Sequence, residues 1–213
     1  MKITKFQHSC LLVEMPEPVN RTVLFDPGAM SESSLNIDKL VYLDDIIITH
    51  VHADHYSPSF ISALIAQFPQ VRITAPREVV IKLQESDVTQ ASSDESEGIV
   101  FFDSPHANVE PLFPLPEQMG VHYLDALTNP GDSHTFSESK DILALPIAGP
   151  WASLVDAAKL AIELKPKYVL PIHDWHLNDA ARQQLYELLA RVLGENNIEF
   201  IPLQTGQPII IDV

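Results

Sequence analysis

Three histidines and one aspartate lie within six consecutive residues of this chain. They directly follow residues 45–49, a β-branched apolar run that predicts a buried strand. Because a strand end fixes the backbone, the turn after it can direct several side chains toward one point. Imidazole binds Zn, Fe and Ni, and a carboxylate adds affinity for harder ions. The segment therefore predicts a metal site, and its four candidate ligands are His50, His52, Asp54 and His55.

Four candidate ligands on one loop are more than a single tetrahedral ion needs while it keeps an open position. We therefore expect two ions that share ligands from elsewhere in the chain. Three further side chains qualify, because each lies at a predicted strand end or in a turn beside a strand, where loops on a rigid scaffold carry function. They are His106 after residues 99–102, Asp132 after the Asn129-Pro130-Gly131 turn, and His173 after residues 168–172.

Apolar periodicity and turn residues predict a mixed α/β chain in which helices cover sheets. Strands are expected at residues 2–14, 21–25, 45–49, 71–75, 99–102, 121–124, 141–146, 167–172, 198–202 and 208–212. Helices are expected at 58–68, 76–83, 153–165 and 179–193, the first capped by Ser57. The helix at 153–165 is expected to turn inward Leu154, Val155, Ala158, Ile162 and Leu164. Residues 84–98 predict an exposed acidic loop, and the prolines of residues 105–120 predict irregular structure.

The acidic balance of the chain argues against nucleic acid as a partner. Asp and Glu total 29 against 13 Lys and Arg, a formal net charge of −16. Affinity for nucleic acid comes mostly from Lys and Arg that neutralise phosphates, and the same holds for anionic membranes. No apolar run approaches the roughly 18 residues of a membrane span, and the N-terminal residues do not resemble a signal peptide. We therefore expect a cytoplasmic protein with no membrane partner.

On these residues the chain resembles the metallo-β-lactamase superfamily over nearly its whole length. The superfamily's H-x-H-x-D-H motif is present at residues 50–55, and the later His, Asp and His of the pattern match His106, Asp132 and His173 in order. Asp26, after a predicted strand, matches the early Asp. The resemblance implies a single domain over residues 1–213, of α/β (α+β) class, built as a four-layer αβ/βα sandwich with the metals at one edge.

Within the superfamily the chain is most similar to the small cytoplasmic metal-dependent hydrolases related to L-ascorbate-6-phosphate lactonase. Three segments carry this similarity: His8-Ser9-Cys10, Gly131-Asp132-Ser133 and Pro171-Ile172-His173. The start of the chain departs from those relatives, because Gln7 precedes His8 where they tend to have Gly.

The resemblance also implies a ligand assignment and a reaction. His50, His52 and His106 would bind the first ion, Asp54, His55 and His173 the second, and Asp132 would bridge the two. Zinc is the expected metal, with manganese or iron as alternatives. A hydroxide between the ions would attack a small ester, lactone or phosphoester. Asp54 and Asp132 are the expected catalytic residues, Asp54 because it could orient the nucleophile or pass a proton to the leaving group. The two aspartates and the hydroxide together leave about one positive charge on two divalent ions, which favours an anionic substrate.

A different class of function stays open on the same fold. The superfamily can also hold iron, so an iron-dependent oxidoreductase of the dioxygenase kind is the alternative to a hydrolase. The native metal would discriminate between the two.

Several side chains near the predicted ligands are expected to contact ligands or substrate. They are His8, Asp26, His134, Trp151, Asp174 and His176. We expect Asp26 to act as a turn carboxylate that accepts hydrogen bonds from backbone N–H groups near the metal loop. Trp151 could either form a pocket wall or simply pack. His122 and Cys10 are expected to be structural, Cys10 as a small buried apolar side chain.

Overall fold

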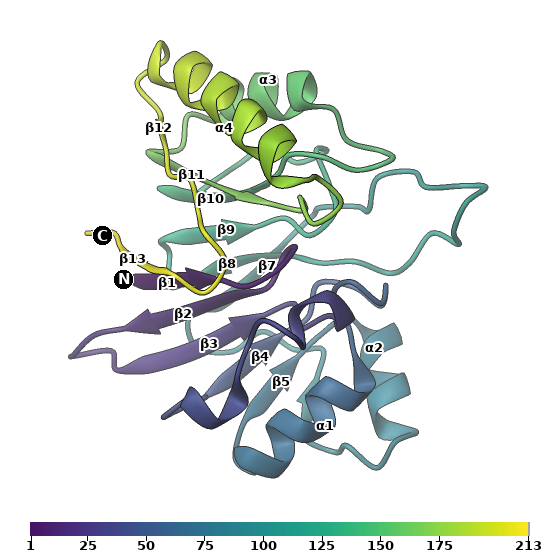
Figure 1. Ribbon diagram of the computed structural model, residues 1–213. Helices are drawn as coiled ribbons and strands as arrows, with labels where there is room; N and C mark the ends of the chain where they lie inside the picture. The colour runs from purple at the N-terminus through teal and green to yellow at the C-terminus, as the bar shows by residue number, and fades with distance from the viewer. Residues whose placement is uncertain (213) are drawn as a thin grey trace. The chain divides into compact units, whose positions relative to one another are not determined.

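A computed structural model describes residues 1–212, and over this range the chain forms two compact units. The first runs from Met1 to Glu95 and takes in the C-terminal segment from Gln204, whereas the second spans Ser96–Leu203. Each unit contains one β-sheet and two α-helices (Figure 1). The mixed α/β class predicted from the sequence is confirmed, and a single domain over residues 1–213 stays a prediction. No helix of the described residues has the length and hydrophobicity needed to cross a bilayer.

The first unit is built on a seven-stranded sheet in the order β13-β1-β2-β3-β4-β5-β6. Its strands are β1 (Lys2–Lys5), β2 (Leu11–Met15), β3 (Arg21–Phe25), β4 (Asp45–Ile47), β5 (Arg72–Thr74), β6 (Ala91–Ser92) and β13 (Pro208–Ile210). Pairing is antiparallel from β13 to β3 and parallel from β3 to β6. The helical segments are η1 (Ala29–Ser31), η2 (Ile37–Lys39), α1 (Pro58–Gln67) and α2 (Arg77–Gln84).

The start of α1 follows directly from its sequence. The Ser57 hydroxyl accepts a hydrogen bond from the Phe60 backbone N–H, and Pro58 occupies the first helical position, where its missing N–H costs nothing. The helix then buries Phe60, Ile61 and Leu64 in an apolar core shared with the sheet and α2. Figure 1 shows α1 and α2 beside β4 and β5.

The second unit is built on a six-stranded sheet in the order β12-β11-β10-β9-β8-β7. Its strands are β7 (Ile99–Phe102), β8 (Gly120–Tyr123), β9 (Leu127–Asn129), β10 (Ile142–Pro146), β11 (Tyr168–Ile172) and β12 (Glu199–Phe200). β7, β8 and β9 pair antiparallel, and β9 to β12 pair parallel. The helices α3 (Leu154–Leu164) and α4 (Asp179–Gly194) lie side by side and share one apolar core with this sheet. Residues 105–119 form neither helix nor strand, as their prolines predict.

Strand direction brings the predicted ligands of each unit to one edge of its sheet. β3 and β4 are parallel, so Asp26 and the turn at residues 50–55 both leave the same edge, and His8 precedes β2 at that edge because β2 is antiparallel to β3. In the second unit β7, β9, β10 and β11 all run in one direction. His106, Asp132 and His173 follow three of these strands. Open α/β sheets bind ligands outside the carboxyl ends of their strands.

Three strand predictions need correction. Residues 2–14 form two strands rather than one, because the chain turns between them at His8, whose φ is +65°. β9 was not predicted, since Leu127-Thr128-Asn129 is too short to show alternation. The acidic segment 84–98 also contains the short strand β6, whose buried Ala91 joins the sheet edge.

The inward face predicted for α3 is wrong in one respect. The buried stripe consists of Ala157, Leu160 and Ala161, at the spacing i, i+3 and i+4 of one helix face. Val155 points to solvent with 61% of its surface exposed, and the other predicted residues are half-buried at the rim. Size explains the difference, because alanines allow the helix to pack closely on the sheet.

The corrected face of α3 can be tested by two truncations on the same helix. We expect Leu160→Ala to lower the free energy of unfolding by about 2–4 kcal/mol, because it removes buried methyl groups and leaves a cavity. Val155→Ala should change it by less than about 0.5 kcal/mol. Urea denaturation of both variants measures the difference, and equal losses would show that the buried stripe is misplaced.

Candidate metal centre

In the first unit the loop after β4 brings three imidazoles and one carboxylate close to one another. The ring centroids of His50 and His52 lie 4.8 Å apart, and those of His50 and His55 lie 4.1 Å apart. Candidate ligand atoms of His8, Asp54 and His55 lie within 4.8 Å of one another. His8 Nε2 is 3.0 Å from Asp54 Oδ2, so the imidazole can donate a hydrogen bond to this carboxylate. The structure thus adds His8 to the group that the motif predicts.

A buried carboxylate holds this loop from the edge of β3. Asp26 Oδ1 accepts hydrogen bonds from the backbone N–H of Thr49 at 2.7 Å and from the Thr49 hydroxyl at 3.0 Å. His55 Nδ1 lies 3.1 Å from Asp26 Oδ2. Thr49 Oγ1 in turn lies 3.1 Å from His50 Nδ1, from which it accepts a hydrogen bond. Asp26 therefore bonds a backbone N–H near the metal loop and also orients two of its imidazoles.

Glycine at position 28 allows two backbone segments to touch beneath the loop. A Cβ atom at Gly28 would lie 1.8 Å from the backbone oxygen of Asp54. Two backbone hydrogen bonds join the same segments, from Ala29 N–H to Ala53 O at 2.8 Å and from Ser57 N–H to Pro27 O at 3.2 Å. The turn after β3 is therefore the support on which the loop at residues 50–55 rests.

In the second unit Asp132 lies between two histidines. Its Oδ2 is 2.9 Å from His173 Nε2 and 3.8 Å from His106 Nε2. All three side chains are buried. The Nδ1 of each histidine donates to a backbone oxygen, His106 to Ala107 at 2.6 Å and His173 to Ala148 at 2.5 Å. These bonds orient each ring so that Nε2 faces Asp132.

The loop that carries Asp132 is held by the side chain of Gln118, a residue that no sequence motif marks. Gln118 Oε1 accepts the Asp132 backbone N–H at 2.9 Å, and its Nε2 donates to the backbone oxygens of Ser104 at 2.8 Å and Pro130 at 3.2 Å. Ser104 Oγ donates to the same Pro130 oxygen. Gln118 stands in a proline-rich segment without any motif, whereas Thr49, also missed, could have been found from its place just before His50.

Several of the predicted pocket residues gather around His173 in the second unit. The Trp151 indole has its centroid 5.3 Å from the rings of both His134 and His173, and 6.3 Å from that of His106. His134 Nε2 donates to the Pro146 oxygen at 2.8 Å, and burial lowers the pKa of this imidazole. His176 is exposed, with its ring 6.3 Å from that of His173.

The Asp174 side chain contacts two residues of helix α4. Its Oδ2 accepts a hydrogen bond from the Tyr186 hydroxyl at 2.5 Å and lies 3.3 Å from Arg182 Nε. Burial, with the carboxylate as a further cause, raises the pKa of the Tyr186 phenol, which therefore stays a donor. Asp174 thus ties the residue after His173 to α4.

Both groups of side chains fit divalent metal ions. Imidazole nitrogens and carboxylate oxygens form a donor set typical of Zn, Mn and Fe. Metal-binding histidines almost always donate their second N–H to a carboxylate or a backbone oxygen. His106 does so to Ala107 and His173 to Ala148, and His55 Nδ1 lies 3.4 Å from Thr49 Oγ1 and 3.1 Å from Asp26 Oδ2. These contacts fix the orientation of each ring.

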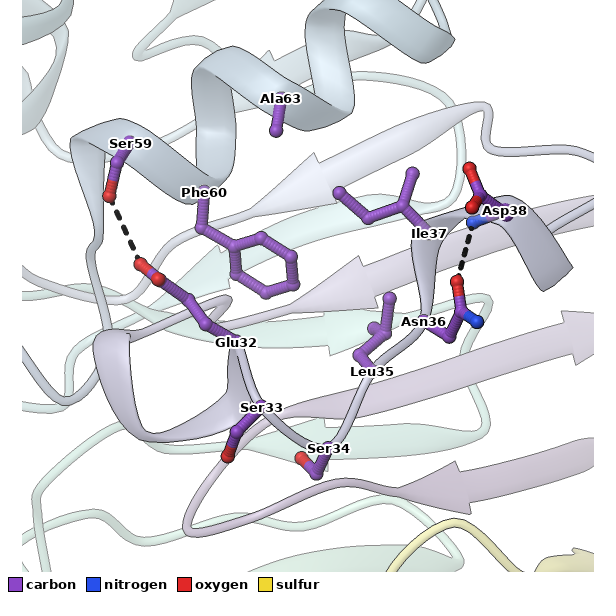
Figure 2. A pocket seen from close by; sticks show the side chains of 10 residues that line it. All are labelled: Glu32, Ser33, Ser34, Leu35, Asn36, Ile37, Asp38, Ser59, Phe60 and Ala63. Carbon is purple, nitrogen blue, oxygen red and sulfur yellow. Dashed lines mark hydrogen bonds between the residues drawn. The ribbon is translucent and has the colours of Figure 1, made fainter.

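A pocket of about 570 Å³ lies elsewhere in the first unit, between the η1–η2 segment and α1 (Figure 2). Figure 2 shows Phe60, Leu35 and Ile37 lining it, with Glu32 at the rim. One Glu32 oxygen accepts hydrogen bonds from the hydroxyls of Ser57 and Ser59. None of the predicted metal ligands lines this pocket, so its side chains brace the start of α1 rather than contribute metal ligands.

His122 and Cys10 have structural surroundings. The His122 ring stacks on Phe102 with centroids 4.3 Å apart, and its two nitrogens contact Thr128 Oγ1 at 3.0 Å and Glu138 Oε1 at 3.3 Å. Cys10 is buried, and burial raises the pKa of its thiol, so the group stays protonated. A protonated, inaccessible thiol is no nucleophile.

Comparison with known proteins identifies relatives over most of the chain. The profile of the β-lactamase superfamily domain matches residues 2–173. A protein of Mycobacterium tuberculosis is 28% identical over 90% of this chain and 92% of its own length. A UPF0173 metal-dependent hydrolase of Pyrococcus furiosus is 24% identical over 81% of this chain and 84% of its own.

One solved structure illustrates the likeness of fold. Igni18, described as a metallo hydrolase from the archaeon Ignicoccus hospitalis, superimposes with a TM-score of 0.73. The two sequences are 17% identical, and the match covers 100% of this chain and 98% of the other. This similarity concerns the fold, and it confirms the fold type predicted from the sequence.

The role of Asp26 can be tested by an isosteric change. In Asp26→Asn the amide oxygen can still accept the Thr49 N–H, but an uncharged amide nitrogen replaces the carboxylate oxygen that lies 3.1 Å from His55 Nδ1. We expect zinc affinity to fall about 10- to 100-fold, as is usual when the partner of a metal-binding histidine is lost. Competition with a fluorescent chelator measures this. Asp38→Asn, which removes the same charge from an exposed position, should bind zinc like the wild type, and unchanged affinity in Asp26→Asn would contradict an orienting role.

The structural assignment of His122 predicts a pH effect. Burial lowers its pKa in the folded protein, against a Glu138 hydrogen bond that raises it. The unfolded chain therefore takes up this proton first as pH falls through about 6.5, and stability declines below that pH. We expect His122→Gln to lose less stability than the wild type between pH 7 and pH 5.5 in urea titrations. Its zinc content at pH 7.5 should equal that of the wild type, and a lost ion would place His122 among the ligands.

Proposed function

Because this chain belongs to the metallo-β-lactamase superfamily, we propose that it is a metal-dependent hydrolase of small esters, lactones or phosphoesters. One observation carries the proposal. In each unit the predicted ligands follow strands that end at one sheet edge. Hydrogen bonds donated by Nδ1 orient the rings of His106 and His173, and the Asp26 carboxylate lies 3.1 Å from His55 Nδ1. A merely structural set of histidines would not need Nε2 directed in this way. The name of the Pyrococcus relative supports hydrolysis in particular.

We propose that the site binds two divalent ions, with zinc as the expected metal. The ligands are those that match the superfamily pattern: His50, His52, Asp54, His55, His106, Asp132 and His173. When bound, two such ions supply a hydroxide nucleophile near neutral pH and positive charge that polarises the electrophile. Seven ligands with two carboxylates leave the centre slightly positive, so we expect substrates that are anionic or become so in the transition state.

The protein's own groups orient the nucleophile and handle protons. Asp54 is the carboxylate with both a fixed partner and access to solvent, because His8 Nε2 lies 3.0 Å from its Oδ2 while a quarter of the Asp54 side chain is exposed. Donation by His8 holds one oxygen of Asp54 in place. The second oxygen can then accept a proton from water and pass it to the leaving group. We propose Asp54 as the proton-transferring residue and His8 as the residue that positions it.

Metal content and a substrate panel test this function together. Protein purified without chelators should hold about two equivalents of zinc or manganese per chain by elemental analysis. It should also turn over at least one of a phosphomonoester, a phosphodiester, a carboxylic ester and a lactone. About one equivalent of iron without any hydrolysis would instead support an oxidoreductase.

A ligand variant links the metals to turnover. Asp132 contacts two histidines of the second unit, so Asp132→Ala should lose at least one ion and about 100-fold or more of kcat. His122→Gln serves as the matched control in the same unit, with metal content and kcat expected within about twofold of the wild type. Retention of both ions in Asp132→Ala would contradict the bridging role.

A further inference from the structure

Trp151 is the large aromatic side chain in contact with the predicted ligands of the second unit. Its indole meets the rings of His134 and His173 edge to face, at interplanar angles of 70° and 63°. It also lies within 6.3 Å of the His106 ring. The indole thus lies in edge-to-face contact with His173 and next to His106, the two predicted histidine ligands of this unit.

The loop that carries Trp151 is anchored at both ends. It leaves the end of β10, where the Ile147 N–H donates to the Ile172 oxygen at 3.1 Å. It re-enters regular structure at Ser153, whose hydroxyl caps α3 through the Asp156 N–H at 3.1 Å. Between these points Gly149 passes close to the site, because a Cβ atom there would lie 3.1 Å from His173 Cε1 and 3.3 Å from Trp151 Nε1. The sequence thus fixes the loop against His173 and brings the indole with it.

The indole packs against His134 and is half-exposed. His134 supports it and is itself held by the Pro146 oxygen. Trp151 keeps intermediate exposure, unlike the buried His106 and His173. An aromatic side chain held in one orientation binds another flat ring at little entropic cost, and an aromatic pair contributes about 0.5–1.5 kcal/mol beyond area burial.

We propose that Trp151 is a specificity-determining residue that favours substrates with a flat ring next to the reacting bond. The inference rests on the proposed function, because it needs the substrate to bind at the metal ligands. The substrate class is then narrower than small esters in general: it consists of aryl or similarly planar esters and phosphoesters, whose ring lies against the indole.

Binding of non-hydrolysable probes tests the proposal without turnover. The chain has two tryptophans, so Trp175→Phe leaves Trp151 as the sole indole. In the zinc-loaded Trp175→Phe protein, phenylphosphonate should change the tryptophan fluorescence and bind about 5- to 10-fold more tightly than methylphosphonate. Equal affinities for the two probes, or no change in fluorescence on phenylphosphonate binding, would overturn the proposal.

Kinetics provide the second test, with substrate pairs that differ only in the ring. The kcat/KM for phenyl phosphate is divided by that for methyl phosphate, and the kcat/KM for phenyl acetate by that for methyl acetate. Each ratio cancels the effects that a variant has on both substrates of the pair. Trp151→Ala should lower this ratio about 5- to 10-fold with unchanged zinc content, and Trp151→Phe should restore it to within about twofold. An unchanged ratio in Trp151→Ala, or loss of zinc from this variant, would contradict a substrate contact.

Wild-type protein that holds zinc but hydrolyses nothing would overturn the proposed function alone, since the phosphonate measurement still decides the role of Trp151.

Discussion

The completely buried carboxylate of Asp26 is the interaction on which the metal loop depends. Taking a carboxylate out of water costs several kcal/mol unless hydrogen bonds replace the lost solvent. Here the replacements are the Thr49 N–H and the Thr49 hydroxyl, and His55 Nδ1 lies 3.1 Å from the same carboxylate. All three come from the end of β4 or from the loop, so the loop cannot move away without leaving the charge unsolvated. Gly28 completes the constraint, because only a residue without Cβ lets the turn lie directly under Asp54.

The second unit fixes its ligands by a different device. There main-chain oxygens take the place of the Asp26 carboxylate. The Nδ1 atoms of His106 and His173 donate to the carbonyl oxygens of Ala107 and Ala148. Backbone hydrogen bonds hold the segments that carry these oxygens, from the Ala107 N–H to the Asp132 oxygen and from the Ile147 N–H to the Ile172 oxygen. Asp132 is then positioned by Gln118, which bonds its N–H from across the loop. Side-chain networks of this kind hold ligands to a fraction of an ångström, which catalysis at a metal requires.

Much of this arrangement can be predicted from the sequence, because it depends on local patterns. The strand Arg21–Phe25, the Ser57–Pro58 helix start and the ligand loop at residues 50–55 all carry their information within a few residues. Contacts that join distant segments could not be predicted. Nothing local marks Gln118 as the partner of Asp132, and the three residues of β9 show no pattern until Tyr123 and Ile142 pair on either side. Which face of α3 is buried is decided by its packing against the sheet, where the small side chains of Ala157 and Ala161 lie.

Three residues at or beside the predicted ligands adopt a backbone conformation that favours glycine. His8, Asp26 and His173 have φ values of +65°, +46° and +59°, in the left-handed region that favours glycine. Each such position costs about 1 kcal/mol or more for a residue with a Cβ. If stability alone mattered, glycine would be favoured at these turns, as at Gly131, whose φ is +63°. Glycine offers no imidazole or carboxylate, however, and all three side chains contact a predicted ligand: His8 contacts Asp54, Asp26 contacts His55, and His173 contacts Asp132. At these three turns the chain therefore keeps a side chain that contacts a predicted ligand where glycine would relieve the strain.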